Sequence, residues 1–391
     1  MKIFREEYFG GILYDTSTLT YKIIKDGKDD IRADRFIPLS FMPERTDIVS
    51  VPVRVYFELT ETCNLSCRHC FVSSSPQSKK GMPSSVIFSL LEDMRDAGVI
   101  NIRFTGGEPT TRDDWFDILN HAKSLGLVVS LSSNGVYKDP DKTISQIASL
   151  GLEQVTFSID GLETNHDYLR GHGSFKSLIN TLEKLKETDV NSRLTTVLTK
   201  LSIRELPEIV ELASKYVKVI NFVFLRVLGR GKEELSISFQ EHYESGLEAE
   251  RLQQYYPDLL ILHSAVVLPG QFVKPGSSSG INFSSSFSNT SLNIAADGTY
   301  WPHHYASHQT DLFKLGKYPE DNIKGVWQSS EVLDKYRAWT GCLQERCFSC
   351  REFRHRCAGF NFEMEVARLT GKIKENYCCI NDTPLRTPWA Q

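Results

Sequence analysis

Three cysteines, Cys63, Cys67 and Cys70, fall within one short stretch of the chain, residues 61–71, which reads Glu-Thr-Cys-Asn-Leu-Ser-Cys-Arg-His-Cys-Phe. Thiolates spaced in this way can hold one compact metal centre, and sulfur is a ligand for iron-sulfur clusters, zinc and cuprous copper. A four-iron cluster that receives only three protein sulfurs keeps one iron open for a substrate, as an open catalytic zinc site does. Three quarters of a structural zinc site, or a set of buried thiols, is the alternative.

A second motif narrows these alternatives. A strand-like run at 53–59 leads into the cysteines, and Gly106-Gly107-Glu108-Pro109 follows a second strand-like run at 102–104. A Cys-x3-Cys-x2-Cys loop after the first strand, with Gly-Gly-Glu-Pro after the second, resembles the radical S-adenosylmethionine (SAM) enzymes.

The resemblance implies a SAM-binding 4Fe-4S cluster on the three cysteines and a set of residues around SAM. Gly106, Gly107 and Glu108 match the positions that receive the amino group of the methionine moiety, and His69 matches a position near the adenine. The positions that contact ribose in the family correspond to Ser132, Asn134, Ser158 and Asp160. The alternative for these later loops is ordinary turn chemistry, because Asn-Gly and Asp-Gly form turns in many proteins.

Short apolar runs alternate with amphipathic stretches from residue 53 to about 231, which predicts repeated strand-helix units and a parallel sheet. The predicted strands are 53–60, 100–105, 127–133, 153–159, 193–199 and 217–226, and the predicted helices are 83–97, 113–125, 141–150, 174–188 and 203–215. Six such units predict an α/β fold with a partial, TIM-like (β/α)6 barrel, the fold that the family also implies. Functional residues should then gather at the carboxyl ends of the strands.

The sequence outside the predicted barrel divides into three parts. Residues 1–52 form a β-rich segment, which is either a packing hairpin or a remnant of the leader-recognition element of some peptide-modifying radical enzymes. If a peptide binds there, strand addition to an exposed edge is the expected mode. Residues 232–291 are predicted to be a linker or active-site flap, because Pro-Gly pairs and a serine-rich run follow an acidic helix. Residues 292–391 form a small cysteine-rich domain.

That last domain carries a second group of cysteines, namely Cys342, Cys347, Cys350, Cys357, Cys378 and Cys379. On spacing alone a structural zinc site is the better interpretation. Behind a radical SAM barrel, the region resembles the SPASM or shorter twitch extension, which carries auxiliary 4Fe-4S clusters. Two positions that usually hold ligands are occupied by Pro302-His303-His304 and by Asn361. We therefore expect one auxiliary cluster, on Cys347, Cys350, Cys357 and one of the last pair, assigned here to Cys378; the role of Cys342 stays open.

Composition excludes several classes of protein. The net charge of −4 over 391 residues, with no basic block, argues against a nucleic-acid partner. No signal peptide and no apolar run long enough to cross a membrane is evident, so we expect a cytoplasmic protein without a membrane partner. Two dense cysteine groups in a large chain favour metal binding over disulfides.

The barrel, the auxiliary domain and the leader-like start together resemble maturases of ribosomally made peptides. The expected function is oxidative modification or crosslinking of a leader-core precursor peptide, with SAM as oxidant and a flavodoxin or ferredoxin as reductase. The first alternative is a radical SAM enzyme acting on a small molecule, such as a porphyrin side chain, an amino sugar or another cofactor precursor. The second is a zinc-stabilised or electron-transfer binding protein that does not cleave SAM.

Overall fold

The computed structural model describes residues 1–25, 31–43, 48–79, 81–264, 289–307, 309–341 and 370–371. The second cysteine group, from Cys342 to Cys379, lies outside the described residues, and so does the serine-rich run at 277–286. The auxiliary cluster therefore stays a prediction.

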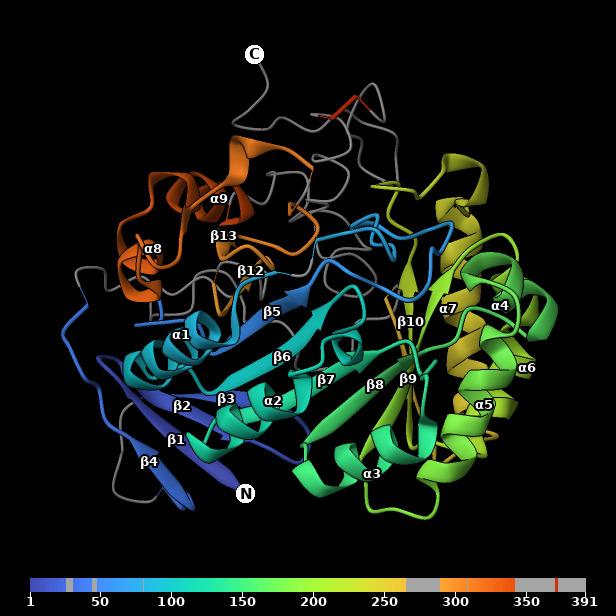
Figure 1. The fold of residues 1–391 in the computed structure, drawn as a ribbon, viewed down its shortest axis with the longest axis horizontal. Coiled ribbons are helices and arrows are strands. Elements are labelled where there is room, and N and C mark those ends of the chain that lie inside the picture. The colour runs from blue at the N-terminus through green and yellow to red at the C-terminus, as the bar shows by residue number, and fades with distance from the viewer. Residues whose placement is uncertain are drawn as a thin grey trace.

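The centre of the molecule is a sheet of parallel strands that curves across Figure 1. Its strands follow the chain order, with each strand parallel to the next. They are β5 (Arg54–Thr60), β6 (Asn101–Gly106), β7 (Val128–Ser133), β8 (Gln154–Ser158), β9 (Ser192–Leu198), β10 (Val219–Phe224) and β11 (Leu260–His263). The first six coincide with the predicted strands to within two residues at each end, and the α/β, partial-barrel fold is confirmed.

Helices between the strands cover the outer face of this sheet, with α1, α2 and α3 in front of β5–β8 in Figure 1. They are α1 (Ser84–Ala97), α2 (Trp115–Ser124), α3 (Pro140–Leu150), α4 (Glu163–Arg170), α5 (Ser174–Leu185), α6 (Leu206–Ser214) and α7 (Phe239–Gln253). On α1 the apolar positions recur at helical spacing and are buried, and Gly98 ends the helix in the left-handed region at φ 96°.

Two segments differ from the sequence prediction. Helix α4 was not predicted, because its sequence is mostly polar and buries only His166 and Leu169. Residues 232–264 were predicted as part of a linker or flap with an acidic helix; the helix is present as α7, and it is followed by the unpredicted strand β11. Helix α7 starts with a capping box between Ser238 and Glu241, and β11 pairs with β10, so this segment extends the barrel sheet by one more unit.

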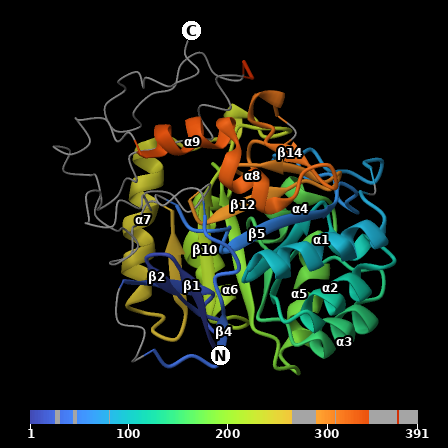
Figure 2. The same cartoon turned by 90° about the vertical axis from the view of Figure 1, so that its left-hand side faces the viewer.

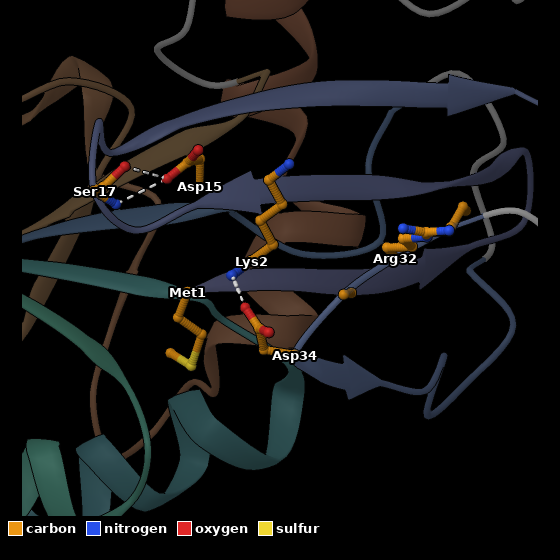
Figure 3. Close-up of a pocket in the computed structure, with 8 residues that line it drawn as sticks. Met1, Lys2, Asp15, Ser17, Arg32 and Asp34 are labelled. Carbon is orange, nitrogen blue, oxygen red and sulfur yellow. Dashed lines mark hydrogen bonds between the residues drawn. The ribbon is translucent and has the colours of Figure 1, made fainter.

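The N-terminal segment is a sheet of its own, with strand order β3-β2-β1-β4, which is more than the predicted hairpin. Its strands are β1 (Lys2–Glu7), β2 (Gly10–Asp15), β3 (Thr20–Lys25) and β4 (Arg35–Ile37). Figure 3 shows a surface pocket at one end of this sheet, where the Lys2 amide donates to Asp34 and Asp15 closes a local turn by accepting from Ser17. The Asp15–Ser17 bonds are ordinary turn chemistry, whereas the Lys2–Asp34 bond joins β1 to the segment that leads into β4.

One buried arginine joins the N-terminal sheet to the barrel. Arg5 forms an ion pair with Glu7 at 2.7 Å and donates to the carbonyl oxygens of Val51, Pro52 and Gly98 at 2.9–3.1 Å. Removing one member of such a buried, hydrogen-bonded pair leaves an uncompensated charge, so the N-terminal sheet is an integral part of this fold.

The C-terminal elements continue the same sheet on the other side of β5. They are β12 (Ser291–Ile294), β13 (Thr299–Trp301), β14 (Gly316–Lys317), α8 (Ile323–Ser329) and α9 (Glu331–Gly341), and they lie at the upper left of Figure 1. The predicted Asp-Gly hairpin is confirmed, with Gly298 at φ 90° between β12 and β13. Strand β12 pairs with β5 in parallel, and Trp327 of α8 donates to the Val49 carbonyl at 2.8 Å. Figure 2 shows α8 and α9 lying across the sheet. None of the described helices is long and apolar enough to span a membrane.

The added unit α7–β11 predicts a pH dependence of stability. The rings of His242 and His263 lie in tilted contact, with their centroids 5.0 Å apart, and bond to Ser264 and Ser245 respectively. Burial, and then Arg226, lowers the pKa of His242 to about 4, and burial, and then His242, lowers the pKa of His263 to about 3. Between pH 6.5 and 4 the unfolded chain binds protons that the folded chain does not, so stability is complete above pH 6.5 and falls with pH across this window. Each proton contributes a slope of about 1.4 kcal/mol per pH unit.

We therefore expect His263→Gln to show a shallower loss of unfolding free energy than the wild type between pH 6.5 and 4, measured by urea denaturation. The exposed His172→Gln is the control and should keep the wild-type slope. Equal slopes in all three proteins would contradict the assignment.

Candidate functional site

The three cysteines of the first motif lie in the loop that follows the carboxyl end of β5. Cys63 and Cys67 are buried, Cys70 is half-buried, and all three are free thiols. Burial, and then Glu108 and the other two cysteines, raises the pKa of Cys63 to about 12. Within the described part of the chain, no three His, Cys, Asp or Glu side chains converge tightly enough to hold a single metal ion. Crowded, buried thiols suit a larger cationic centre whose charge stabilises the thiolates, and this donor set fits an iron-sulfur cluster.

Arg230, in the loop after β10, fixes the backbone of the cysteine loop. Its guanidinium donates to the carbonyl oxygens of Cys67, Ser73 and Ser74 at 2.7–2.8 Å. Its amide donates to the carbonyl of Cys70 at 2.9 Å. Four bonds from one residue hold the shape of the loop independently of any bound group.

Gly106 and Gly107 bring the end of β6 directly against the same loop. A Cβ atom on Gly107 would lie 2.1 Å from the carbonyl oxygen of Thr62, and one on Gly106 would lie 2.3 Å from that of Thr60. Gly106 also has φ 127°, a conformation that side chains rarely adopt. The motif therefore has a packing role, since only glycine permits this approach.

Glu108 connects the cysteine loop to the end of β7. Its carboxylate is fully buried and accepts from the Asn134 amide at 2.7 Å, the Ser133 hydroxyl at 3.0 Å and Thr110. Burial raises its pKa despite these bonds. Asn134 donates to the Asn64 side chain at 2.8 Å and contacts the Cys63 sulfur at 3.7 Å. A continuous network thus runs from Glu108 to the first cysteine.

Asp160 forms a second buried centre at the end of β8. Its carboxylate contacts Arg170 Nε at 2.5 Å and His69 Nε2 at 2.9 Å, and accepts from the Val197 amide at 2.7 Å. Burial by itself raises the pKa of Asp160, but the charges of Arg170 and then His69 outweigh it and hold the pKa well below its usual range. With both oxygens engaged, Asp160 is placed to orient His69 in the cysteine loop.

Ser132 and Ser158 differ from these engaged groups. Both are half-exposed, and neither hydroxyl has a hydrogen-bond partner among the described residues. The structure thus brings all the residues predicted from the first two motifs to one rim of the sheet, with the two serines available to a ligand. Arg170 and Arg230 were missed: Arg170 lies on the unpredicted α4, while Arg230 stands in a Gly-Arg-Gly sequence whose rim position was recognisable.

The family comparison matches the Radical SAM superfamily over residues 57–213, the segment that carries both motifs and most of the parallel sheet. This chain contains a radical SAM domain. It is a SAM-dependent enzyme, so the zinc-stabilised or electron-transfer binding protein that the sequence left open is wrong. The family implies SAM and a 4Fe-4S cluster.

The alignments with curated relatives extend beyond residues 57–213. The mycofactocin maturase MftC of Mycolicibacterium smegmatis is 27% identical over 78% of this chain and 77% of its own length. The PqqA peptide cyclase of Bradyrhizobium diazoefficiens is 25% identical over 81% and 84%. The AdoMet-dependent heme synthase of Methanosarcina barkeri is 25% identical over 85% and 97%.

Among solved structures, Streptococcus suis SuiB bound to S-adenosylmethionine superposes with a TM-score of 0.75 at 16% identity, over 93% of this chain and 95% of that one. This similarity shows that the two proteins share a fold.

Gly107→Ala tests the close approach of β6 to the cysteine loop. The new methyl group would collide with backbone atoms of Thr62, so the loop must shift, at a cost of about 1–3 kcal/mol. We expect a lower melting temperature and less iron per chain after reconstitution. Gly325→Ala in α8, where a Cβ atom meets nothing closer than 3.4 Å, is the control and should retain both. Full iron loading of Gly107→Ala would contradict the packing role.

Proposed function

We propose that this enzyme reductively cleaves SAM and removes a hydrogen atom from a peptide substrate. The observation that carries the proposal is the meeting of the three-cysteine loop and the Gly-Gly-Glu loop at the carboxyl ends of adjacent parallel strands. Cys63, Cys67 and Cys70 would hold the 4Fe-4S cluster. Gly106, Gly107 and Glu108, with Ser132 and Ser158, would receive SAM.

When bound, the cluster and SAM supply an electron and the 5'-deoxyadenosyl radical that takes the hydrogen atom. The protein side chains hold this site in place and keep water from it. Glu108 and Asn134 position the first cysteine, and Asp160 with Arg170 positions His69 beside the third. We accordingly assign Asn134 and Asp160 to the cofactor site as residues that position their neighbours.

The peptide substrate is supported by relatives named as a maturase and as a peptide cyclase, each aligned over more than three quarters of its length. Loss of a hydrogen atom and one further electron is a net oxidation of a side chain, which yields modification or crosslinking. We propose that an auxiliary 4Fe-4S cluster on Cys347, Cys350, Cys357 and Cys378 accepts that electron, and that a flavodoxin or ferredoxin reduces the SAM-binding cluster. A cytoplasmic location and the lack of nucleic-acid and membrane partners stay predictions.

The N-terminal sheet offers two edges to a leader segment, because β3 and β4 are its outer strands. Phe36 on β4 is 60% exposed and could pack against an added strand. We propose that the leader of a leader-core precursor binds there.

Iron content tests the cluster assignment. Anaerobically reconstituted wild type should hold about eight irons, and a Cys63/Cys67/Cys70 triple alanine variant about four, because each 4Fe-4S cluster holds four. Cleavage of SAM to 5'-deoxyadenosine should occur only in the wild type. Four irons in the wild type would contradict the proposed auxiliary cluster. Failure of the wild type to cleave SAM would overturn the proposed activity.

The substrate class needs a separate experiment. The enzyme is incubated with SAM, reductant and either precursor peptides encoded beside it or porphyrins, and deoxyadenosine is measured. We expect a precursor peptide to stimulate deoxyadenosine formation. The substitution Phe36→Asp, on the exposed edge of the N-terminal sheet (residues 1–37), should abolish this stimulation. Stimulation by a porphyrin alone would favour the small-molecule alternative, to which the similarity with the heme synthase points.

A further inference from the structure

Two arginines and a glutamine occupy one level of the inner face of the sheet. Arg103 on β6, Gln154 on β8 and Arg193 on β9 alternate with fully buried apolar residues that face the helices. Ser130 of β7 stands between Arg103 and Gln154 in the strand register. These residues belong to different strands, and the side chains of the two arginines meet at Gln154.

The two guanidinium groups share one neutral acceptor. Arg103 Nη2 donates to Gln154 Oε1 at 2.8 Å, and Arg193 Nη1 reaches the same oxygen at 3.5 Å. The Nε atoms of both arginines are buried and have no hydrogen-bond partner among the described residues. No carboxylate of the described ranges lies within ion-pair distance of either guanidinium.

The surrounding charges make this arrangement costly. Burial, and then Arg193, lowers the pKa of Arg103 to about 9, and burial also lowers the pKa of Arg193. A third guanidinium, Arg54, lies on the same face and bonds to Asn101, Tyr14 and Leu19. Two acidic groups of β5 lie on this face. Glu58 stands further along the strand, where it accepts from Asn293 and Ser307. Tyr56 pairs in register with Arg103; burial raises the pKa of its phenol, but the charges of Arg54 and then Arg103 outweigh burial and lower that pKa.

Arginine keeps its charge over the working range of pH, so the cost is not relieved by losing a proton. Buried charges in proteins are normally paired, and a guanidinium matches the two oxygens of a carboxylate. An anion bound beside the two guanidiniums would accept from the Nε donors and reduce the repulsion between Arg103 and Arg193.

We propose that Arg103 and Arg193 form a binding site for a carboxylate group of the substrate. Arg103 stands three residues before Gly106, which places the site about 10 Å below the rim where SAM is proposed to bind. A carboxylate held at that depth would anchor the substrate while the bond to be cleaved stays at the rim. That the ligand is the substrate rests on the proposed function, whereas the anion site itself does not.

The test uses a matched pair of small probes, the α-amides of N-acetyl-glutamic acid and N-acetyl-glutamine, at equal ionic strength. Thermal denaturation of the reconstituted enzyme with SAM measures binding. We expect the acid to raise the melting temperature of the wild type and the neutral amide not to. Arg103→Gln and Arg193→Gln should bind the acid at least about tenfold more weakly, whereas the surface variant Arg251→Gln should bind it as the wild type does.

The variant Gln154→Glu tests the same site while keeping both arginines, so the proposal stays testable even if the arginine variants fail to fold. It places a carboxylate between the two guanidiniums without changing the side-chain shape, so it should raise the melting temperature without probe and abolish the response to the acid. An unchanged or lowered melting temperature, or a wild-type response to the acid in this variant, would overturn the proposal. SAM cleavage is measured in parallel. If the wild type does not cleave SAM, the proposed function is refuted, whereas the anion site is judged by the melting temperatures alone.

Discussion

Strand β5 connects the two halves of the central sheet, because its backbone pairs with a neighbouring strand on both edges. One edge pairs with β6 and starts the series of parallel strands, and the other pairs with β12, which brings the C-terminal elements into the same sheet. Parallel strands place their carboxyl ends on one rim. The cysteine loop leaves β5 at that rim, between the Gly-Gly-Glu loop and the C-terminal segment.

Two buried carboxylates then convert a set of adjacent loops into one site. Glu108 joins β6 to β7 and, through Asn134, to Cys63; Asp160 joins β8 to β9, α4 and His69. Each carboxylate is costly to bury and is compensated by several donors, so the loops cannot separate without leaving a charge or a donor unsatisfied. Arg230, in the loop after β10, adds a third connection to the cysteine loop from several strands away in the sheet. Preorganisation of the cysteine loop is thus built into the protein.

The inner face of the sheet has the opposite balance. There the guanidiniums of Arg103 and Arg193 share a neutral glutamine, whereas the two carboxylates at the rim each accept several hydrogen bonds from the protein. Protein interiors tolerate such excess charge mainly where function requires it. The level of Arg103 and Arg193, with its unpaired positive charge, is suited to anchoring a ligand. The rim, where the loops are held by hydrogen bonds, is suited to the chemistry.

Short sequence patterns were enough to predict the series of parallel strands and the two motifs whose loops meet at the rim. Apolar runs of strand length, ended by glycine and polar residues, located β5–β10 to within two residues, and Cys63, Cys67, Cys70 and Gly106-Gly107-Glu108 indicated the chemistry. Local patterns carry this information because strand periodicity and ligand spacing are properties of short segments. The sequence missed α4, whose residues are mostly polar, and it predicted the acidic helix α7 but placed it in a linker or flap and missed β11. The folded chain was needed to show that Asp160 bonds His69 and Arg170, that Arg230 holds the cysteine loop, and that Arg103 and Arg193 share Gln154. These contacts join residues from different strand-helix units, and their distances follow from how the sheet curves, which no short segment encodes.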